Sequence, residues 1–242
     1  MNTVQTHYDN HLGLVYSWMA GGMDHALERG AGEIDSLELL PRRSGIAVDL
    51  GAGFGMHAIA LAERGFEVLA VDSCRALIVE LEERKRALAI RTVHDTIESF
   101  RAYLTGRPEL ILCMGDTLTH LDSEPIVQTL VQEVADAMEP GGRFIATFRD
   151  YSQALEGERR FIPVRADTDR ILTCFLEYSE RYVAVHDILH KREAADWKMS
   201  VSAYRKLRIA PEEFGLLLTR CGFAVELAAG PAGMVQFSAV LR

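Results

Sequence analysis

Three glycines stand at alternate positions behind an aspartate in VDLGAGFG, residues 48–55. Glycine lets a backbone turn sharply and approach a ligand closely, because it has no Cβ. Such a loop, between a buried strand and a helix, is typical of a site for a nucleotide or nucleoside. The dinucleotide fingerprint GxGxxG requires a third glycine where this chain has Met56, so the loop does not match that fingerprint.

Acidic and polar residues follow at the ends of the next predicted strands. Asp72 ends the second strand about twenty residues after the loop, where an acid can hydrogen bond both hydroxyls of a ribose. Ser73 follows Asp72 directly. The third predicted strand ends with Asp95 and Thr96, and the fourth ends with Met114 and Gly115. Asp72 and Asp95 can equally cap the following helices, and Met114 can belong to the core. Taken together, the set predicts a nucleoside site along one edge of a sheet.

The elements that must position these residues alternate in type from residue 45 onward. Short apolar runs predict buried strands, and amphipathic stretches between them predict helices. The predicted strands are 45–51, 66–73, 90–96, 108–115 and 143–151, and the main helices are 55–64, 74–89 and 126–139. This alternation predicts an α/β fold with a doubly wound, mostly parallel sheet covered on both faces.

The pattern changes outside this core. Residues 152–206 favour three antiparallel strands, which we interpret as an inserted β cap over a substrate pocket. Residues 1–44 are mostly helical and carry aromatic side chains, so we expect an N-terminal helical lid. Residues 45–151 and 207–242 then form the ligand-binding core, and the chain closes with a helix at 211–222 and an antiparallel hairpin.

Composition excludes several classes of protein. The 242 residues are 48% hydrophobic and 25% charged, with a net charge of −9, and this acidic balance argues against a nucleic-acid partner. No apolar run approaches the roughly 18 to 20 residues of a membrane span. The first residues lack the features of a signal peptide, so we expect a cytoplasmic protein whose four widely spaced cysteines are free thiols.

The pattern DxGxGxG, beginning at Asp49, resembles motif I of the class I S-adenosylmethionine-dependent methyltransferases. The predicted final antiparallel strand is similar to theirs, so the resemblance implies a Rossmann-like, seven-stranded methyltransferase fold with S-adenosylmethionine as cofactor. It further implies that Asp72 and Ser73 lie near the ribose, Asp95 and Thr96 near the adenine, and that a lid aromatic closes the site. The implied cofactor-binding set is Tyr16, Asp49, Gly51, Gly53, Asp72, Ser73, Asp95, Thr96, Met114 and Gly115.

Two further segments resemble the glycine and sarcosine N-methyltransferases. MGDTLTHL, residues 114–121, is similar to their GNSxxHL segment, and IATFRDY, residues 145–151, to their fifth strand. The resemblance implies that Arg149 pairs with a substrate carboxylate, for which its forked guanidinium is suited. Asp116 and Asp150 stand where that group has asparagine, so we expect an amine or amino-acid-like acceptor rather than glycine itself.

The candidate catalytic residues are Asp116, His120 and Arg149. His186 is a further candidate base; it and His190 lie on one face of a predicted strand, and we expect no metal there. The leading hypothesis is a methyltransferase acting on a small molecule, in a chain compatible with a homo-oligomer. The alternatives are an O- or S-methyltransferase, a non-catalytic S-adenosylmethionine-binding protein, and an NAD-linked enzyme, against which Met56 argues.

Overall fold

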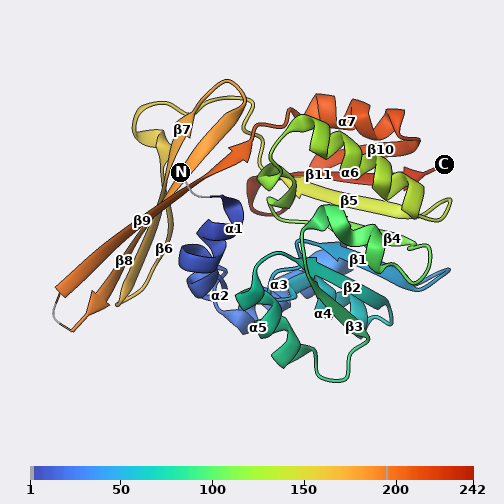
Figure 1. Ribbon diagram of the computed structural model, residues 1–242, viewed down its shortest axis with the longest axis horizontal. Coiled ribbons are helices and arrows are strands. Elements are labelled where there is room, and N and C mark those ends of the chain that lie inside the picture. The colour runs from blue at the N-terminus through green and yellow to red at the C-terminus, as the bar shows by residue number, and fades with distance from the viewer. Residues whose placement is uncertain (1–2, 195) are drawn as a thin grey trace.

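The computed structural model describes residues 3–194 and 196–242, which form two sheets joined by a helical N-terminal segment (Figure 1). Within these residues, the larger sheet has seven strands in the order β10-β11-β5-β4-β1-β2-β3. The five parallel strands are β1 (Ile46–Leu50), β2 (Glu67–Asp72), β3 (Ile90–His94), β4 (Leu110–Cys113) and β5 (Arg143–Phe148). The predicted doubly wound core is confirmed.

The antiparallel hairpin completes one side of this sheet. It consists of β10 (Phe223–Ala229) and β11 (Val235–Leu241), and β11 pairs antiparallel with β5 as well as with β10. The order of strands reverses between β1 and β4, where the chain leaves one half of the sheet for the other. Ligands of open α/β sheets bind beyond the carboxyl ends of the strands at such a point.

Side chains of the parallel strands alternate between two apolar layers. Val48, Ile111 and their equivalents pack with α6 (Glu124–Ala137) and α7 (Pro211–Arg220). On the opposite face of the sheet, Ala47, Leu112 and the equivalent residues of neighbouring strands pack with α3 (Met23–Ser36) and α4 (Met56–Glu63). The helix α5 (Arg75–Lys85) follows β2, and a 3₁₀ segment, Ile97–Tyr103, follows β3. Burial on both faces explains why β1, β2, β4 and β5 are largely apolar, whereas β3, at the edge of the sheet, carries polar and exposed residues.

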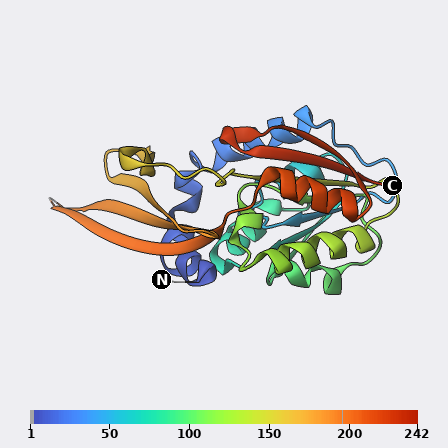
Figure 2. The same cartoon turned by 90° about the horizontal axis from the view of Figure 1, so that it is seen from above.

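The cap is an antiparallel sheet of four strands in the described residues, not the three predicted. It comprises β6 (Phe161–Ala166), β7 (Arg170–Tyr178), β8 (Tyr182–Glu193) and β9 (Asp196–Leu207), paired in chain order. The missed strand, β6, is a largely exposed edge with a register shift between Pro163 and Arg165. The far ends of β8 and β9 project well away from the core (Figures 1 and 2).

The N-terminal helices lie between cap and core, as the blue segment of Figure 1 shows. They comprise α1 (Val4–His7), a π-helical turn at Tyr8–Leu12, a 3₁₀ turn at Gly13–Val15 and α2 (Tyr16–Met19), before α3. Leu12, Val15 and Trp18 pack against Leu172 and Leu189 of the cap. The predicted lid and inserted cap are therefore present. None of the helices in residues 3–194 and 196–242 is both long and apolar enough to cross a membrane.

Candidate functional site

The glycine loop after β1 adopts a backbone that only glycine tolerates well. Gly51, Gly53 and Gly55 have φ angles of 77°, 55° and 93°. A Cβ on Gly51 would lie 2.4 Å from Oγ1 of Thr117, and one on Gly55 would lie 2.3 Å from a methyl group of Leu81. The loop is therefore compressed against neighbouring segments, and its bare backbone faces the edge of the sheet where a ligand binds.

Asp72 ties the end of β2 to this loop. One carboxylate oxygen accepts a hydrogen bond from the amide of Gly53 at 2.8 Å, and the other accepts from the amide of Cys74 at 2.7 Å. Burial raises the pKa of Asp72 above its usual value, against the effect of these two bonds. Each oxygen has a second lone pair, so the carboxylate can hold the loop and still accept from two hydroxyls.

Asp49, at the start of motif I, is almost completely buried in β1. Its Oδ2 has no hydrogen-bond partner among the described residues. Burial raises the pKa of Asp49 to about 6, and the nearby His57 acts in the opposite direction. An orphaned, buried acceptor beside the glycine loop fits a site for a cationic group.

Polar groups line the ends of the next two strands. Asp95 accepts from the hydroxyl of Tyr103 at 2.7 Å and from the amide of Thr96 at 2.8 Å, and these bonds lower its pKa. His94 Nε2 lies 3.0 Å from the carbonyl oxygen of Ser73. Asp95 is half-buried, and its carboxylate is engaged in a turn.

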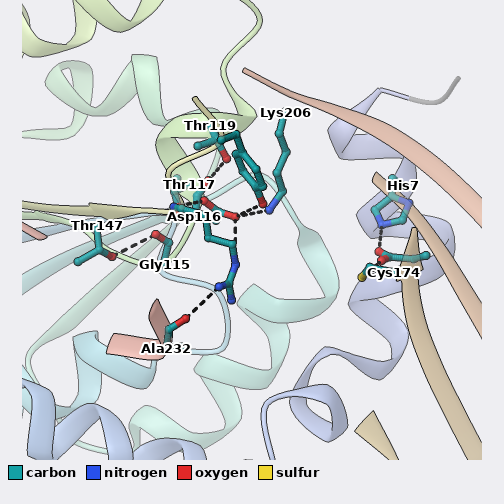
Figure 3. A network of polar contacts seen from close by, with 12 residues as sticks. His7, Gly115, Asp116, Thr117, Thr119, Thr147, Cys174, Lys206 and Ala232 are labelled. Carbon is teal, nitrogen blue, oxygen red and sulfur yellow. Dashed lines mark hydrogen bonds and ion pairs between the residues drawn. The ribbon is translucent and has the colours of Figure 1, made fainter. Parts of the chain in front are cut away.

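Met114 and Gly115 follow β4. The Met114 side chain is buried among apolar neighbours, while its carbonyl accepts from the Thr117 hydroxyl at 3.1 Å. Gly115 has a φ of 75°, and its carbonyl accepts from the hydroxyl of Thr147 on β5 (Figure 3). These bonds fix the β4 turn directly beneath the glycine loop, since Thr117 also touches Gly51.

Asp116 joins three segments that are distant in sequence. Its carboxylate accepts from the amide of Arg149 at 2.9 Å, the hydroxyl of Tyr151 at 3.0 Å and Nζ of Lys206 at 2.5 Å (Figure 3). Burial opposes ionisation, but Lys206 and the other donors prevail and lower the pKa of Asp116 to about 2. A carboxylate this firmly ionised is a poor proton acceptor at neutral pH, which favours a positioning role.

Arg149 lies at the mouth of this cluster. Its Nη1 donates to the carbonyl of Ala232 at 2.9 Å, and its Nε is 3.8 Å from Asp116 (Figure 3). The side chain is 46% exposed, so part of the guanidinium remains accessible for an anionic group. Its predicted pairing with a substrate carboxylate remains a prediction.

His120 lies among aromatic rings from the lid and the cap. Its ring centroid is 5.6 Å from that of Tyr8 and 5.7 Å from that of Tyr204. Its Nε2 is buried and has no hydrogen-bond partner in the part of the chain that the structure describes. Burial, followed by the charge of Lys206, lowers the pKa of His120 to about 3, so the imidazole is neutral.

The lid reaches both halves of the site. The ring of Tyr16 is 6.0 Å from that of Phe54 in the glycine loop and 5.8 Å from that of Tyr8. Burial raises the pKa of Tyr16, which keeps its hydroxyl protonated and able to donate. Tyr16 thus packs beside the predicted cofactor loop, and Tyr8 beside His120.

The cap strand β8 does not present His186 to this site, contrary to our expectation of a candidate base there. His186 pairs with Glu177 at 2.5 Å on the more exposed face of the cap. The next residue, Asp187, points inward and lies 2.9 Å from Nε2 of the fully buried His7, whose Nδ1 is 2.8 Å from the hydroxyl of Ser202. Successive side chains of a β-strand point to opposite faces of the sheet, so His186 and Asp187 cannot both face the site. Asp187 is the inward residue because it pairs with His7 of the lid.

The structure adds three site residues that the sequence does not predict: Lys206, Asp187 and His7. The only local signal was Tyr204, whose alternate-residue spacing from Lys206 places both on one face of β9. A cavity of about 380 Å³ between α6 and α7, bordered by Glu124, Leu207 and Leu217, contains none of the predicted site residues.

Comparison with known proteins agrees with this geometry. Residues 47–142 match the family model described as "Methyltransferase domain". On this match, we name residues 47–142 the methyltransferase domain. The methyltransferase domain covers β1 to the turn before β5, and therefore includes the glycine loop, Asp72, Asp116 and His120.

Curated relatives of this methyltransferase domain include two glycine/sarcosine N-methyltransferases. The one from Halorhodospira halochloris is 29% identical over 130 residues, covering 53% of this chain and 48% of the relative. The one from Aphanothece halophytica is 28% identical over 154 residues, covering 62% and 58%. The chain spans about half the length of the curated relatives it matches.

The fold has close counterparts among solved structures. The CcbJ methyltransferase from Streptomyces caelestis superposes with a TM-score of 0.78 at 19% identity, over 98% of both chains. The predicted methyltransferase fold and the resemblance to S-adenosylmethionine-dependent methyltransferases are thus confirmed. The solved structures of similar fold include one that holds S-adenosylmethionine, the amino pentose methyltransferase CalS10 from Micromonospora echinaspora. The roles of individual site residues stay predictions.

Proposed function

We propose that this protein transfers a methyl group from S-adenosylmethionine to the nitrogen of a small amine or amino acid. The methyltransferase domain and the two glycine/sarcosine N-methyltransferase relatives support this assignment. The observation that carries the choice of nitrogen is the neutral, weakly basic His120, whose buried Nε2 lacks a partner within the described ranges.

The residues present fit the cofactor. The glycine loop is a cradle that a Cβ would fill, Asp72 keeps free lone pairs for ribose hydroxyls, and Asp49 offers a buried acceptor for an ammonium. Asp95 and Thr96 would contact the adenine, with Ser73, Met114 and Gly115 lining the same trough and Tyr16 covering it. When bound, the sulfonium supplies an activated methyl group.

The remaining task of the chain is to position an acceptor and exclude water. Lid, cap and sheet edge enclose His120 between Tyr8 and Tyr204, and Arg149 offers an accessible cation for an acceptor carboxylate. Holding reactants in line in this way can contribute up to about 7–11 kcal/mol to a rate acceleration. His120 can accept a hydrogen bond from the acceptor and so aim its lone pair.

The weak basicity of His120 distinguishes between acceptors. A neutral amine attacks through its lone pair and sheds a proton only after its nitrogen has become cationic. An alcohol must lose its proton during attack and needs a stronger base. An imidazole with a pKa of about 3, beside a carboxylate with a pKa of about 2, suits the amine better.

The test is incubation with S-adenosylmethionine labelled in its methyl group and a panel of primary amines, amino acids, alcohols and thiols. Mass spectrometry should show label on nitrogen, most readily for amines that also carry a carboxylate. Asp72→Ala is the matched control with weakened cofactor binding, and it should transfer less label at a low concentration of S-adenosylmethionine. Label on oxygen or sulfur would overturn the choice of nitrogen, and tight cofactor binding without transfer to any acceptor would favour a non-catalytic binding protein.

A further inference from the structure

A buried lysine connects the cap to the methyltransferase domain. Lys206, near the end of β9, is 8% exposed and reaches Asp116, which follows β4. Its Nζ also lies 5.9 Å from the ring centroid of Tyr151 and 5.8 Å from that of Tyr204. Burial disfavours its charge, but Asp116 raises the pKa of Lys206 above its usual value, so the lysine is a permanent cation.

This cation stands close to the imidazole of the site. Tyr204 touches both groups: its ring is 5.7 Å from that of His120 on one side and 5.8 Å from Lys206 Nζ on the other. We propose that Lys206 is a positioning residue that holds the cap on Asp116 and, by its charge, opposes protonation of the His120 imidazole. The mechanistic value of this role rests on the proposed function, in which His120 must be free to accept a hydrogen bond.

The groups that face His120 come from every element packed around it. The ionisable ones are Asp116 after β4, Asp187 on β8, Tyr204 and Lys206 on β9, His7 on α1 and Tyr8 in the π-helical turn. The two carboxylates favour a proton on the imidazole, whereas Lys206 and His7 oppose it. Among these opposing groups Lys206 exerts the larger effect, after burial itself.

The pairing with Asp116 explains why a lysine is needed. Asp116 organises the turns after β4 and β5, but an unpaired carboxylate here would draw a proton onto the neighbouring imidazole. Lys206 cancels that charge from the opposite side. The acid after β4 and the cation on the cap thus form one ion pair across the two parts of the protein.

The experiment compares the protonation of His120 in the wild type and four variants. Its ring resonance, identified by its loss in His120→Gln, is titrated by NMR in the wild type, in Lys206→Met, in Lys206→Arg and in the double variant Asp116→Asn/Lys206→Met. Lys198→Met is the matched control, because Lys198 lies on the same strand, is 68% exposed and pairs with Glu193. Lys206→Gln replaces Lys206→Met if the latter does not fold.

We expect His120 in Lys206→Met to titrate about 1–3 pH units higher than in the wild type, because an unpaired carboxylate shifts a neighbouring imidazole by that much. Lys206→Arg, Lys198→Met and the double variant should titrate as the wild type does. If the protein transfers methyl groups, the pKa of the acidic limb of its pH–rate profile should rise together with the pKa of His120. An unshifted titration in Lys206→Met would overturn the proposal, whereas failure of the wild type to methylate an amine would overturn only the proposed function.

Discussion

Replacing Asp49 by asparagine should make the protein more stable near neutral pH. Burial raises the pKa of Asp49 from 3.8 to about 6, so the folded state binds a proton more tightly than the unfolded chain does. The folded protein therefore loses stability as the pH rises between these values. At about 1.36 kcal/mol per pKa unit, the loss reaches about 3 kcal/mol at pH 7.5 and about 1 kcal/mol at pH 4.5.

Asparagine resembles the protonated acid in shape and has no charge to desolvate. Guanidinium unfolding of Asp49→Asn without added cofactor should therefore show a gain of about 3 kcal/mol at pH 7.5 that shrinks to about 1 kcal/mol at pH 4.5. Asp122→Asn, at an exposed position in the β4–α6 connection, should change stability by less than about 0.5 kcal/mol. A loss of stability, or a gain equal at both pH values, would refute the reasoning.

Three further substitutions test other contacts. Asp72→Ala should weaken S-adenosylmethionine binding about 10- to 100-fold in calorimetry, since a hydrogen bond to a charged group is worth about 1.5–3 kcal/mol, and unchanged affinity would contradict its ribose role. Gly51→Ala should cost about 1–3 kcal/mol from its positive φ alone. Adding Thr117→Ala removes the side-chain atoms that the new Cβ would meet but leaves the backbone of residue 51 at its positive φ. If the double variant regained the full wild-type stability in denaturant unfolding, backbone strain at this position would be unimportant. His7→Leu removes the lid partner of Asp187, whose carboxylate still accepts from the Cys174 thiol, and should accelerate amide exchange in residues 4–12; equal protection would argue against this lid-to-cap bond.

The parallel core could be predicted because its information is local. Each strand is a short apolar run, each helix shows its own periodicity, and Pro140-Gly141-Gly142 marks the turn before β5. The strand β6 could not be predicted, because among the described residues it pairs only with β7, its side chains are mostly exposed and Pro163 lacks a backbone N–H donor. An edge strand of this kind forms because its backbone pairs with a neighbouring strand, not because its own sequence favours a strand.

The site residues also fall into those that could be predicted from local sequence and those that could not. The glycine loop and the acids at the strand ends could be predicted, because the order of strands brings their carboxyl ends to one edge. Lys206 could not, since in YRKLR it looks like a solvated residue and its burial depends on Asp116, ninety positions earlier. The sequence also does not indicate whether His186 or Asp187 faces inward, because that depends on the pairing of Asp187 with His7, which is 180 positions earlier in the chain.

The position of β11 between β5 and β10 has a consequence for how the protein is made. Until the ribosome has synthesised residues 235–241, β5 has an unpaired edge and β10 has no partner at all. That open edge persists while the entire cap and α7 are being translated, and exposed strand edges recruit other chains. A ribosome that stalls inside β8 would therefore leave a nascent chain that is prone to aggregate, although its glycine loop is already complete.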